Sequence, residues 1–255
     1  MKSGTIKSVI NVDWFTVAPG IWGMRDAFVN VYFIHNAVEK KWVLIDTGLK
    51  RTASKIKELA EYLFWPDSKP AAIILTHGHF DHVGSASELA YEWDVPVFAH
   101  LMELPYLSGL SAYPPADPWA GGGLMSVVSP AFPAGPFNIS EHLQLLPEDG
   151  SLPFLPDWRY IHTPGHSPGH VFFKLESKGH RAAFIGDVWH HLLQVYYPDW
   201  NFPKNSDAAQ AKVSRRKVLD YCASSGALVF PGHVGLPFAG RIEATDKGYR
   251  PNFPP

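Results

Sequence analysis

The feature that most constrains this chain is the stretch ILTHGHFDHVGSASELA at residues 74–90, where metal-capable side chains crowd into one turn. An apolar, strand-like run ends there, and residues 77–82 then carry His77, His79, Asp81 and His82. In an extended segment the first three lie on one side, because side chains alternate, and Gly78 tolerates unusual backbone angles. Partly buried imidazoles need partners and repel one another when charged, so a structural role does not explain this cluster.

The chemistry of this turn predicts metal binding. Neutral imidazole and carboxylate groups are donors suited to zinc, iron or manganese. A loop this tight does not present all of its donors to a single ion. We therefore expect the pair His77 and His79 and the pair Asp81 and His82 to face two different ions.

Four further strand-like runs place polar side chains in the turns that follow them. Asp46 follows WVLI, His166 lies within HTPGHSPGH, Asp187 follows FIG, and His233 follows VFPG. Strand ends in α/β sheets gather at one edge, where sites form. We expect His166 and His233 to give each ion a third protein ligand, and Asp187, with its two carboxylate oxygens, to bridge both ions.

The periodicity of apolar residues predicts a layered α/β fold. Residues 28–35, 41–45, 71–75 and 95–100 read as strands, and residues 51–65 and 86–93 carry helical stripes. Strand patterns return at 158–163, 170–176 and 181–187, followed by a helix from an Asn205 or Ser206 cap to about Cys222 and a strand at 227–233. This order predicts two β-rich halves packed face to face, with helices outside.

Residues 109–137 form an irregular, Pro/Gly-rich excursion between the two halves. The segment also carries Tyr113, Trp119, Met125 and Phe132, which a purely solvated loop would not keep. Long loops in compact domains are often lids or binding loops, so we expect a substrate cover here, with a homodimer contact as the alternative. An apolar substrate pocket lined by aromatic residues is a second expectation. Its expected lining residues are Trp22, Phe28, Trp119, Trp189 and Trp200.

Composition excludes several classes of partner. The formal net charge is −2, and the longest basic run is Arg215–Lys217, so we expect no nucleic-acid partner. The N-terminal segment lacks the 7–15-residue apolar region of a signal peptide, and no run of about 18 apolar residues occurs. We therefore expect a cytoplasmic protein without a membrane partner. The single cysteine, Cys222, excludes an intrachain disulfide and is expected to be a small core residue.

The motifs THGHFDHVG, TPGHSPGH, GD and PGH occur in the order that the metallo-β-lactamase superfamily shows, and IDTG at 45–48 resembles its early strand-end aspartate. The resemblance spans residues 29–235. It implies one domain over residues 1–255, folded as an αββα sandwich of two mixed sheets with a dinuclear metal site at one edge. By the resemblance, His77, His79 and His166 hold the first metal, Asp81, His82 and His233 hold the second, and Asp187 bridges them. Asp46 would lie outside this set of residues and orient one of the metal-binding side chains.

The expected reaction is hydrolysis of a small-molecule substrate. Two ions about 3.5–4 Å apart can share a hydroxide whose pKa they lower towards neutrality, and this hydroxide attacks a carbonyl or phosphorus centre. Zinc is the expected metal, with iron or manganese as alternatives. Asp81, as a ligand, and His190, as a hydrogen-bond donor to a leaving group or substrate oxygen, are the predicted catalytic residues; Tyr196 or Tyr197 would also reach the site.

Within the superfamily, the resemblance favours the lactonase, arylesterase and methyl parathion hydrolase-like branch. The tail 235–251 resembles the ending of the last type. Asp187 disfavours a class B β-lactamase, and the absence of a basic surface disfavours the nucleases. Trp189 and His190 stand where quorum-quenching lactonases carry a tyrosine, which counts against acyl-homoserine lactones. The alternatives are a glyoxalase II-like thioester hydrolase, disfavoured by the short segment after His233, and a non-hydrolytic iron-dependent redox protein on the same cage.

Overall fold

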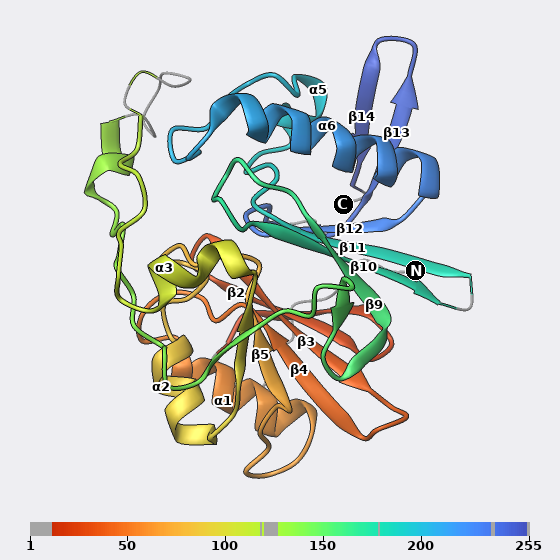
Figure 1. The fold of residues 1–255 in the computed structure, drawn as a ribbon. Helices are drawn as coiled ribbons and strands as arrows, with labels where there is room; N and C mark the ends of the chain where they lie inside the picture. The colour runs from red at the N-terminus through yellow and green to blue at the C-terminus, as the bar shows by residue number, and fades with distance from the viewer. Residues whose placement is uncertain (1–11, 118, 120–126, 178, 236–237, 254–255) are drawn as a thin grey trace.

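The computed structural model shows two β-sheets packed face to face, with helices on both outer faces (Figure 1). It describes residues 12–117, 119, 127–177, 179–235 and 238–253. Helices α1 and α2 cover one sheet and α6 covers the other. The predicted αββα sandwich of two mixed sheets is therefore confirmed.

The first sheet has seven strands in chain order. Neighbours from β1 to β4 are antiparallel, and those from β4 to β7 are parallel. Parallel neighbours need crossover connections, which α1 and α2 supply after β4 and β5. The strands are β1 (Trp14–Ala18), β2 (Ile21–Asp26), β3 (Val29–Asn36), β4 (Lys41–Ile45), β5 (Ala72–Ile74), β6 (Val97–Ala99) and β7 (Leu143–Leu145). The helices are α1 (Ala53–Leu63), α2 (Ala86–Trp93) and, after β6, η1 (Leu101–Glu103) and α3 (Leu104–Leu107).

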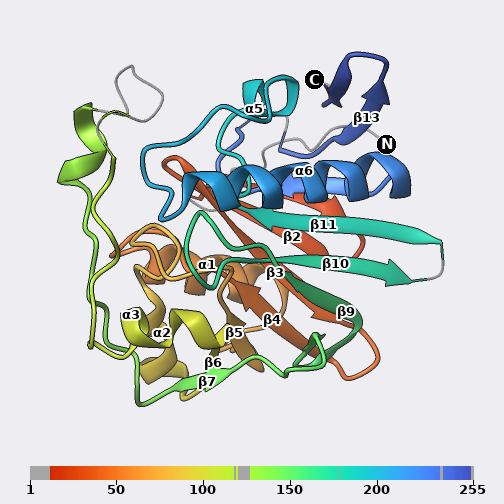
Figure 2. The same ribbon diagram turned by 45° about the horizontal axis from the view of Figure 1, so that its top comes forward.

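The second sheet has five strands in the order β12-β11-β10-β9-β8. Only β11 and β12 run parallel, and α6 connects them. A separate hairpin, β13–β14, lies beside α6 (Figure 2). The elements are η2 (Ser129–Ala131), β8 (Ser151–Leu152), β9 (Leu155–His162), β10 (Val171–Ser177), β11 (His180–Gly186), α5 (Leu193–Tyr196), α6 (Ala208–Ser225), β12 (Leu228–Pro231), β13 (Arg241–Thr245) and β14 (Gly248–Asn252).

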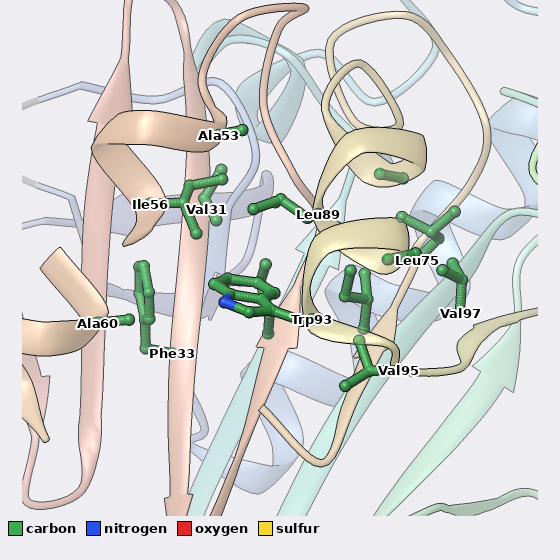
Figure 3. Close-up of a cluster of buried hydrophobic side chains, with 14 of the residues drawn as sticks. Val31, Phe33, Ala53, Ile56, Ala60, Leu75, Leu89, Trp93, Val95 and Val97 are labelled. Carbon is green, nitrogen blue, oxygen red and sulfur yellow. The ribbon is translucent and has the colours of Figure 1, made fainter. Parts of the chain in front are cut away.

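Alternation along the strands builds three apolar layers. In β3, Val31 and Phe33 face the helices, where Figure 3 shows them near Ile56 of α1 and Leu89 and Trp93 of α2. The intervening residues of β3 face the second sheet and join its apolar side chains. A third layer lies between the second sheet and α6. Side chains of the central strands therefore alternate in direction but not in polarity, because both faces of these strands are buried.

The structure corrects some details of the expected elements. The predicted strands and helices at 28–100 and 158–233 are present with small shifts of their ends, but the expectation did not include β1, β2, β7, β8 or the hairpin β13–β14. The cap of α6 is Asp207, whose carboxylate accepts a hydrogen bond from the backbone N–H of Gln210 at 2.9 Å, not Asn205 or Ser206. Any of these three residues suits a cap, so local sequence does not choose between them.

The irregular segment 109–137 is described only in part, since residue 118 and residues 120–126, with Met125, lie outside the described residues. The lime-green part of the segment lies away from the sandwich in Figures 1 and 2. Trp119 is 91% exposed, whereas Tyr113 is buried. Whether the segment acts as a lid or as a dimer contact stays a prediction. Among the described residues, no helix combines the length and apolar character that a membrane crossing requires.

Cys222 lies on the buried face of α6, and burial raises the pKa of its thiol to about 12. The thiolate is the reactive form, so we expect a thiol-reactive disulfide reagent at pH 8 to label the folded protein roughly 100-fold more slowly than the denatured protein. The measurement is the time course of labelling with and without guanidinium chloride. Rapid labelling of the folded protein would show that Cys222 is accessible.

Candidate metal centre

The side chains singled out in the sequence meet at one edge of the sandwich, because each follows the end of a strand. Residues 77–82 follow β5, His166 follows β9, Asp187 follows β11 and His233 follows β12. A hydrogen bond from the Val171 N–H to the Thr76 carbonyl (3.0 Å) ties the two sheets together at this edge. The sandwich thus brings together groups that are far apart in the sequence.

His77, His79 and His166 form the first ligand group. The Nδ1 of His79 lies 3.1 Å from Nε2 of His77 and 2.9 Å from Nε2 of His166. Burial, together with the neighbouring histidines, holds the pKa of His77 and the pKa of His79 well below the usual value. The imidazoles of His77 and His79 are therefore neutral near pH 7, and the ring nitrogens of all three histidines lie close enough to share one cation.

Asp81, His82 and His233 form the second ligand group. The Oδ2 of Asp81 lies 3.5 Å from Nε2 of His233 and 4.0 Å from Nε2 of His82. The chain reverses between His79 and His82, whose backbone N–H donates to the His79 carbonyl at 2.9 Å. Because of this turn, the side chain of Asp81 lies with His82 and His233 rather than with the first ligand group.

Asp187 lies between the two groups. Its Oδ1 is 3.2 Å from Nε2 of His82, and its Oδ2 is 3.2 Å from Nε2 of His166 and 3.0 Å from Nε2 of His233. Burial raises the pKa of Asp187, but the surrounding histidines outweigh it and hold the pKa well below the usual value. An ionised carboxylate that lies within 3.2 Å of histidines from both groups is suited to bridge two cations.

In four of these histidines, Nδ1 points away from the centre of the site and lies within hydrogen-bond distance of an oxygen atom. The pairs are His77 Nδ1 with Thr76 Oγ1 (3.0 Å), His82 Nδ1 with Asp46 Oδ2 (2.8 Å), His166 Nδ1 with Asn205 Oδ1 (3.0 Å) and His233 Nδ1 with the Phe28 carbonyl (2.9 Å). Such contacts place the proton on Nδ1 and direct the lone pair of Nε2 inward, as metal ligands require. Asp46 therefore lies where the sequence predicted, behind His82.

Unpaired buried atoms test whether these residues fit a metal. Among the described residues, Nε2 of His82 and Oδ1 of Asp187 are buried and make no hydrogen bond, although they lie 3.2 Å from each other. A buried polar atom without a partner carries a cost that a cation between the two groups would remove. The donor set of imidazoles and carboxylates suits zinc, iron and manganese alike. The residues therefore fit a metal site, and their roles as ligands stay predictions.

Gly78 is required for space rather than for backbone conformation. It is not among the residues with positive φ, contrary to the expectation of unusual angles. A Cβ at this position would lie 2.4 Å from the Tyr113 hydroxyl and 2.6 Å from Cδ2 of Leu107. The loop that carries His77 and His79 thus packs directly against the start of the 109–137 segment.

A pocket of about 530 Å³ opens onto both ligand groups. Four phenylalanines line it: Phe28, Phe80, Phe132 and Phe202. Of the aromatic residues expected to line a pocket, only Phe28 does so. Trp22 and Trp189 pack in the cores, while Trp119 and Trp200 are exposed, because tryptophan suits a core or a surface as readily as a pocket.

His190 lies in the pocket wall, with Nε2 3.1 Å from Oδ2 of Asp187 and its ring stacked on Phe202 at a centroid distance of 3.5 Å. Burial lowers the pKa of His190 to about 3, so its imidazole is neutral near pH 7 and carries one N–H. Its catalytic role stays a prediction. Tyr196 and Tyr197, by contrast, are exposed and do not line the pocket.

The sequence did not single out several residues that support the site. Besides Thr76 and Asn205, His170 is fully buried; its Nε2 accepts a hydrogen bond from the Asp187 N–H at 3.0 Å, and its Nδ1 contacts Thr163 Oγ1 at 2.9 Å. The second histidine of TPGHSPGH was the available signal for this residue. The sequence marked Asn205 only as a possible helix cap, and the residue instead reaches His166 from a distant loop.

Comparisons with known proteins agree with this geometry. The metallo-β-lactamase superfamily model matches residues 24–233. The probable metallo-hydrolase YflN of Bacillus subtilis is 48% identical over 158 residues, or 62% of this chain and 60% of its own length. The hydroxyacylglutathione hydrolase GloC of Haemophilus influenzae is 27% identical over 197 residues, 76% of this chain and 81% of its own.

Among solved structures, AidC, a dizinc quorum-quenching lactonase, superposes with a TM-score of 0.70 at 20% identity, covering 92% of this chain and 80% of AidC. At this identity the likeness establishes the fold. The match to YflN spans less than two thirds of that relative's length. The match of the family model covers most of the chain and includes every residue of both ligand groups. The chain belongs to the metallo-β-lactamase superfamily.

Proposed function

We propose that this protein is a dinuclear metal-dependent hydrolase that cleaves an ester or lactone bond. The observation that carries the proposal is the place of Asp187, whose carboxylate approaches histidines of both ligand groups at one end of an apolar pocket. When bound, two divalent ions supply Lewis acidity and lower the pKa of water enough for attack near neutral pH. Zinc is the proposed metal, in line with the dizinc relative of the same fold.

The residues of the site have separate roles in this proposal. The first ligand group would hold one ion and the second would hold the other, with the carboxylate of Asp187 between them. Asp81 is the carboxylate ligand on the pocket side of the second group. His190 lies beside Asp187 and, as a neutral imidazole, can donate a hydrogen bond to a substrate oxygen or leaving group.

The pocket wall suggests the kind of substrate. Phenylalanine rings bind apolar acyl chains or aromatic leaving groups through their faces and edges. Phe80 and Phe132 lie 5.2 Å apart, and Phe28 lies 6.4 Å from Phe80, so the rings form one continuous surface. We therefore propose a small ester or lactone with an apolar arm.

The main alternative is thioester hydrolysis, which the similarity to GloC favours. The other alternative is an iron-dependent redox role for the same residues. Metal content and substrate range separate the three: an ester or lactone hydrolase turns over with zinc and without oxygen, whereas a redox protein requires iron and an oxidant.

The first test is turnover of a panel of p-nitrophenyl esters, lactones, thioesters and phosphotriesters. We expect the zinc-loaded protein to hydrolyse apolar esters or lactones, to lose activity in a chelator and to recover it when zinc is restored. Metal analysis should find two ions per chain. One ion per chain with no turnover of any ester would overturn the proposal.

Replacing a residue of the first ligand group should remove metal. For His77→Ala, we expect the loss of at least one ion per chain and a fall in hydrolysis of at least about 100-fold, since the site loses a direct ligand. His180→Ala, at an exposed position in β11, is the matched control and should keep both ions. Unchanged metal content in His77→Ala would contradict the assignment.

His190→Ala separates a catalytic role from metal binding. If His190 donates a hydrogen bond to developing negative charge, kcat should fall roughly 10- to 100-fold while both ions remain bound. The measurements are kcat, KM and metal content of the same preparation. An unchanged kcat would exclude the catalytic role, and loss of an ion would make His190 a ligand instead.

A further inference from the structure

Glu103 is a fully buried carboxylate that belongs to neither ligand group. It ends η1, on the connection from β6 to α3, and the proposed chemistry does not use it. A buried carboxylate is costly unless its oxygens are paired, so its contacts identify what it does.

The carboxylate of Glu103 accepts hydrogen bonds from two loops of the site, at 77–82 and 163–170, and from Tyr113 of the 109–137 segment. Oε2 accepts from the N–H of Gly78 (2.9 Å) and from the Tyr113 hydroxyl. Oε1 accepts from the Ser167 hydroxyl (2.6 Å) and the N–H of Gly169 (2.7 Å). Two of these four donors are backbone N–H groups, which can donate a hydrogen bond but cannot accept one.

These loops are the ones that carry the first ligand group. Gly78 separates His77 from His79, and Ser167 directly follows His166. The second ligand group is anchored differently. The His82 carbonyl accepts from Thr47, and the turn before His233 contacts Asn30. The turn at 77–82 also carries Asp81 and His82, but the groups that Glu103 contacts there and in the other loop, Gly78 and Ser167, are direct neighbours of the first group's histidines.

We propose that Glu103 is a positioning residue that holds the three histidines of the first ligand group in register and so sets the affinity of that site for its ion. The inference rests on the proposed dinuclear function. Tyr113 extends the same link to the 109–137 segment, so the segment is tied to the metal loop at its base.

Glu103→Gln is the informative change because it keeps the size of the side chain. Glutamine offers one oxygen and one NH2 group, so either Gly78 or Gly169 must face a donor instead of an acceptor. Loss of such an outer contact typically lowers metal affinity about 10- to 100-fold. Glu141→Gln, at an exposed position, is the matched control.

The experiment is a zinc titration of the full chain in competition with a chelating dye, combined with metal analysis and thermal unfolding. We expect wild type and Glu141→Gln to bind two ions with the same affinities. Glu103→Gln should keep one ion at wild-type affinity and bind the other about 10- to 100-fold more weakly. Unchanged affinity for both ions, or equal weakening of both, would overturn the proposal.

A double-mutant comparison assigns the weakened site. In His233→Ala, which disrupts the second ligand group, adding Glu103→Gln should weaken the remaining ion about 10- to 100-fold. In His79→Ala, which disrupts the first, the same addition should change affinity by less than about 3-fold. The opposite pattern would refute the assignment. If Glu103→Gln fails to fold, Tyr113→Phe removes one donor to the same oxygen, and it should weaken the same ion.

A wild-type protein that binds no zinc would overturn the proposed function and this inference together. A wild type that binds two ions, with Glu103→Gln indistinguishable from it, would overturn this inference alone. A lower melting temperature without a site-selective loss of affinity would show that Glu103 acts only in stability and would equally refute the positioning role.

Discussion

The central constraint on this molecule is the burial of two carboxylates, Asp81 and Asp187, among the ring nitrogens of five histidines. Nδ1 of His79 lies within hydrogen-bond distance of both His77 and His166, and, within the described part of the chain, Nε2 of His82 and Oδ1 of Asp187 are buried without a hydrogen bond. Burying polar atoms without partners carries a free-energy cost. Cations between the two ligand groups would relieve it, and the surrounding oxygens already hold the histidines in the tautomer that a cation needs.

This arrangement depends on the sandwich. Each sheet delivers its donors at strand ends, and neither sheet carries a complete ligand group by itself: His166 comes from the second sheet to meet His77 and His79 from the first, and His233 comes to meet Asp81 and His82. The apolar layer between the sheets therefore fixes the distances within the site. Packing and metal binding are coupled, because loosening that layer would move donors apart.

The pocket wall and the residues that hold the loops of the site are two further features of this protein. Four phenylalanines make the wall apolar, and His190 places a neutral imidazole beside Asp187. Glu103 accepts hydrogen bonds from the loops of the site, and His170 accepts one from the backbone N–H of Asp187. In the proposed function, the ions would supply the chemistry and the apolar wall would select the substrate.

The sequence alone determined the residue types of the candidate site and the order of its elements. The crowded turn at 77–82, the polar residues after apolar runs, and the helical stripes are local patterns, and local chemistry sufficed to interpret them. The αββα architecture followed from that order together with the family motifs. Short strands such as β8, and the hairpin β13–β14, were not predicted because few residues carry their patterns.

Only the tertiary structure decided which distant groups meet. That Asn205 contacts His166 rather than capping α6, that Glu103 joins two loops, and that phenylalanines rather than tryptophans line the pocket depend on contacts between residues far apart in the chain. The physical reason is that a side chain's local sequence fixes its chemistry and its secondary structure. Its partners are set by the packing of the two sheets, which no local pattern encodes.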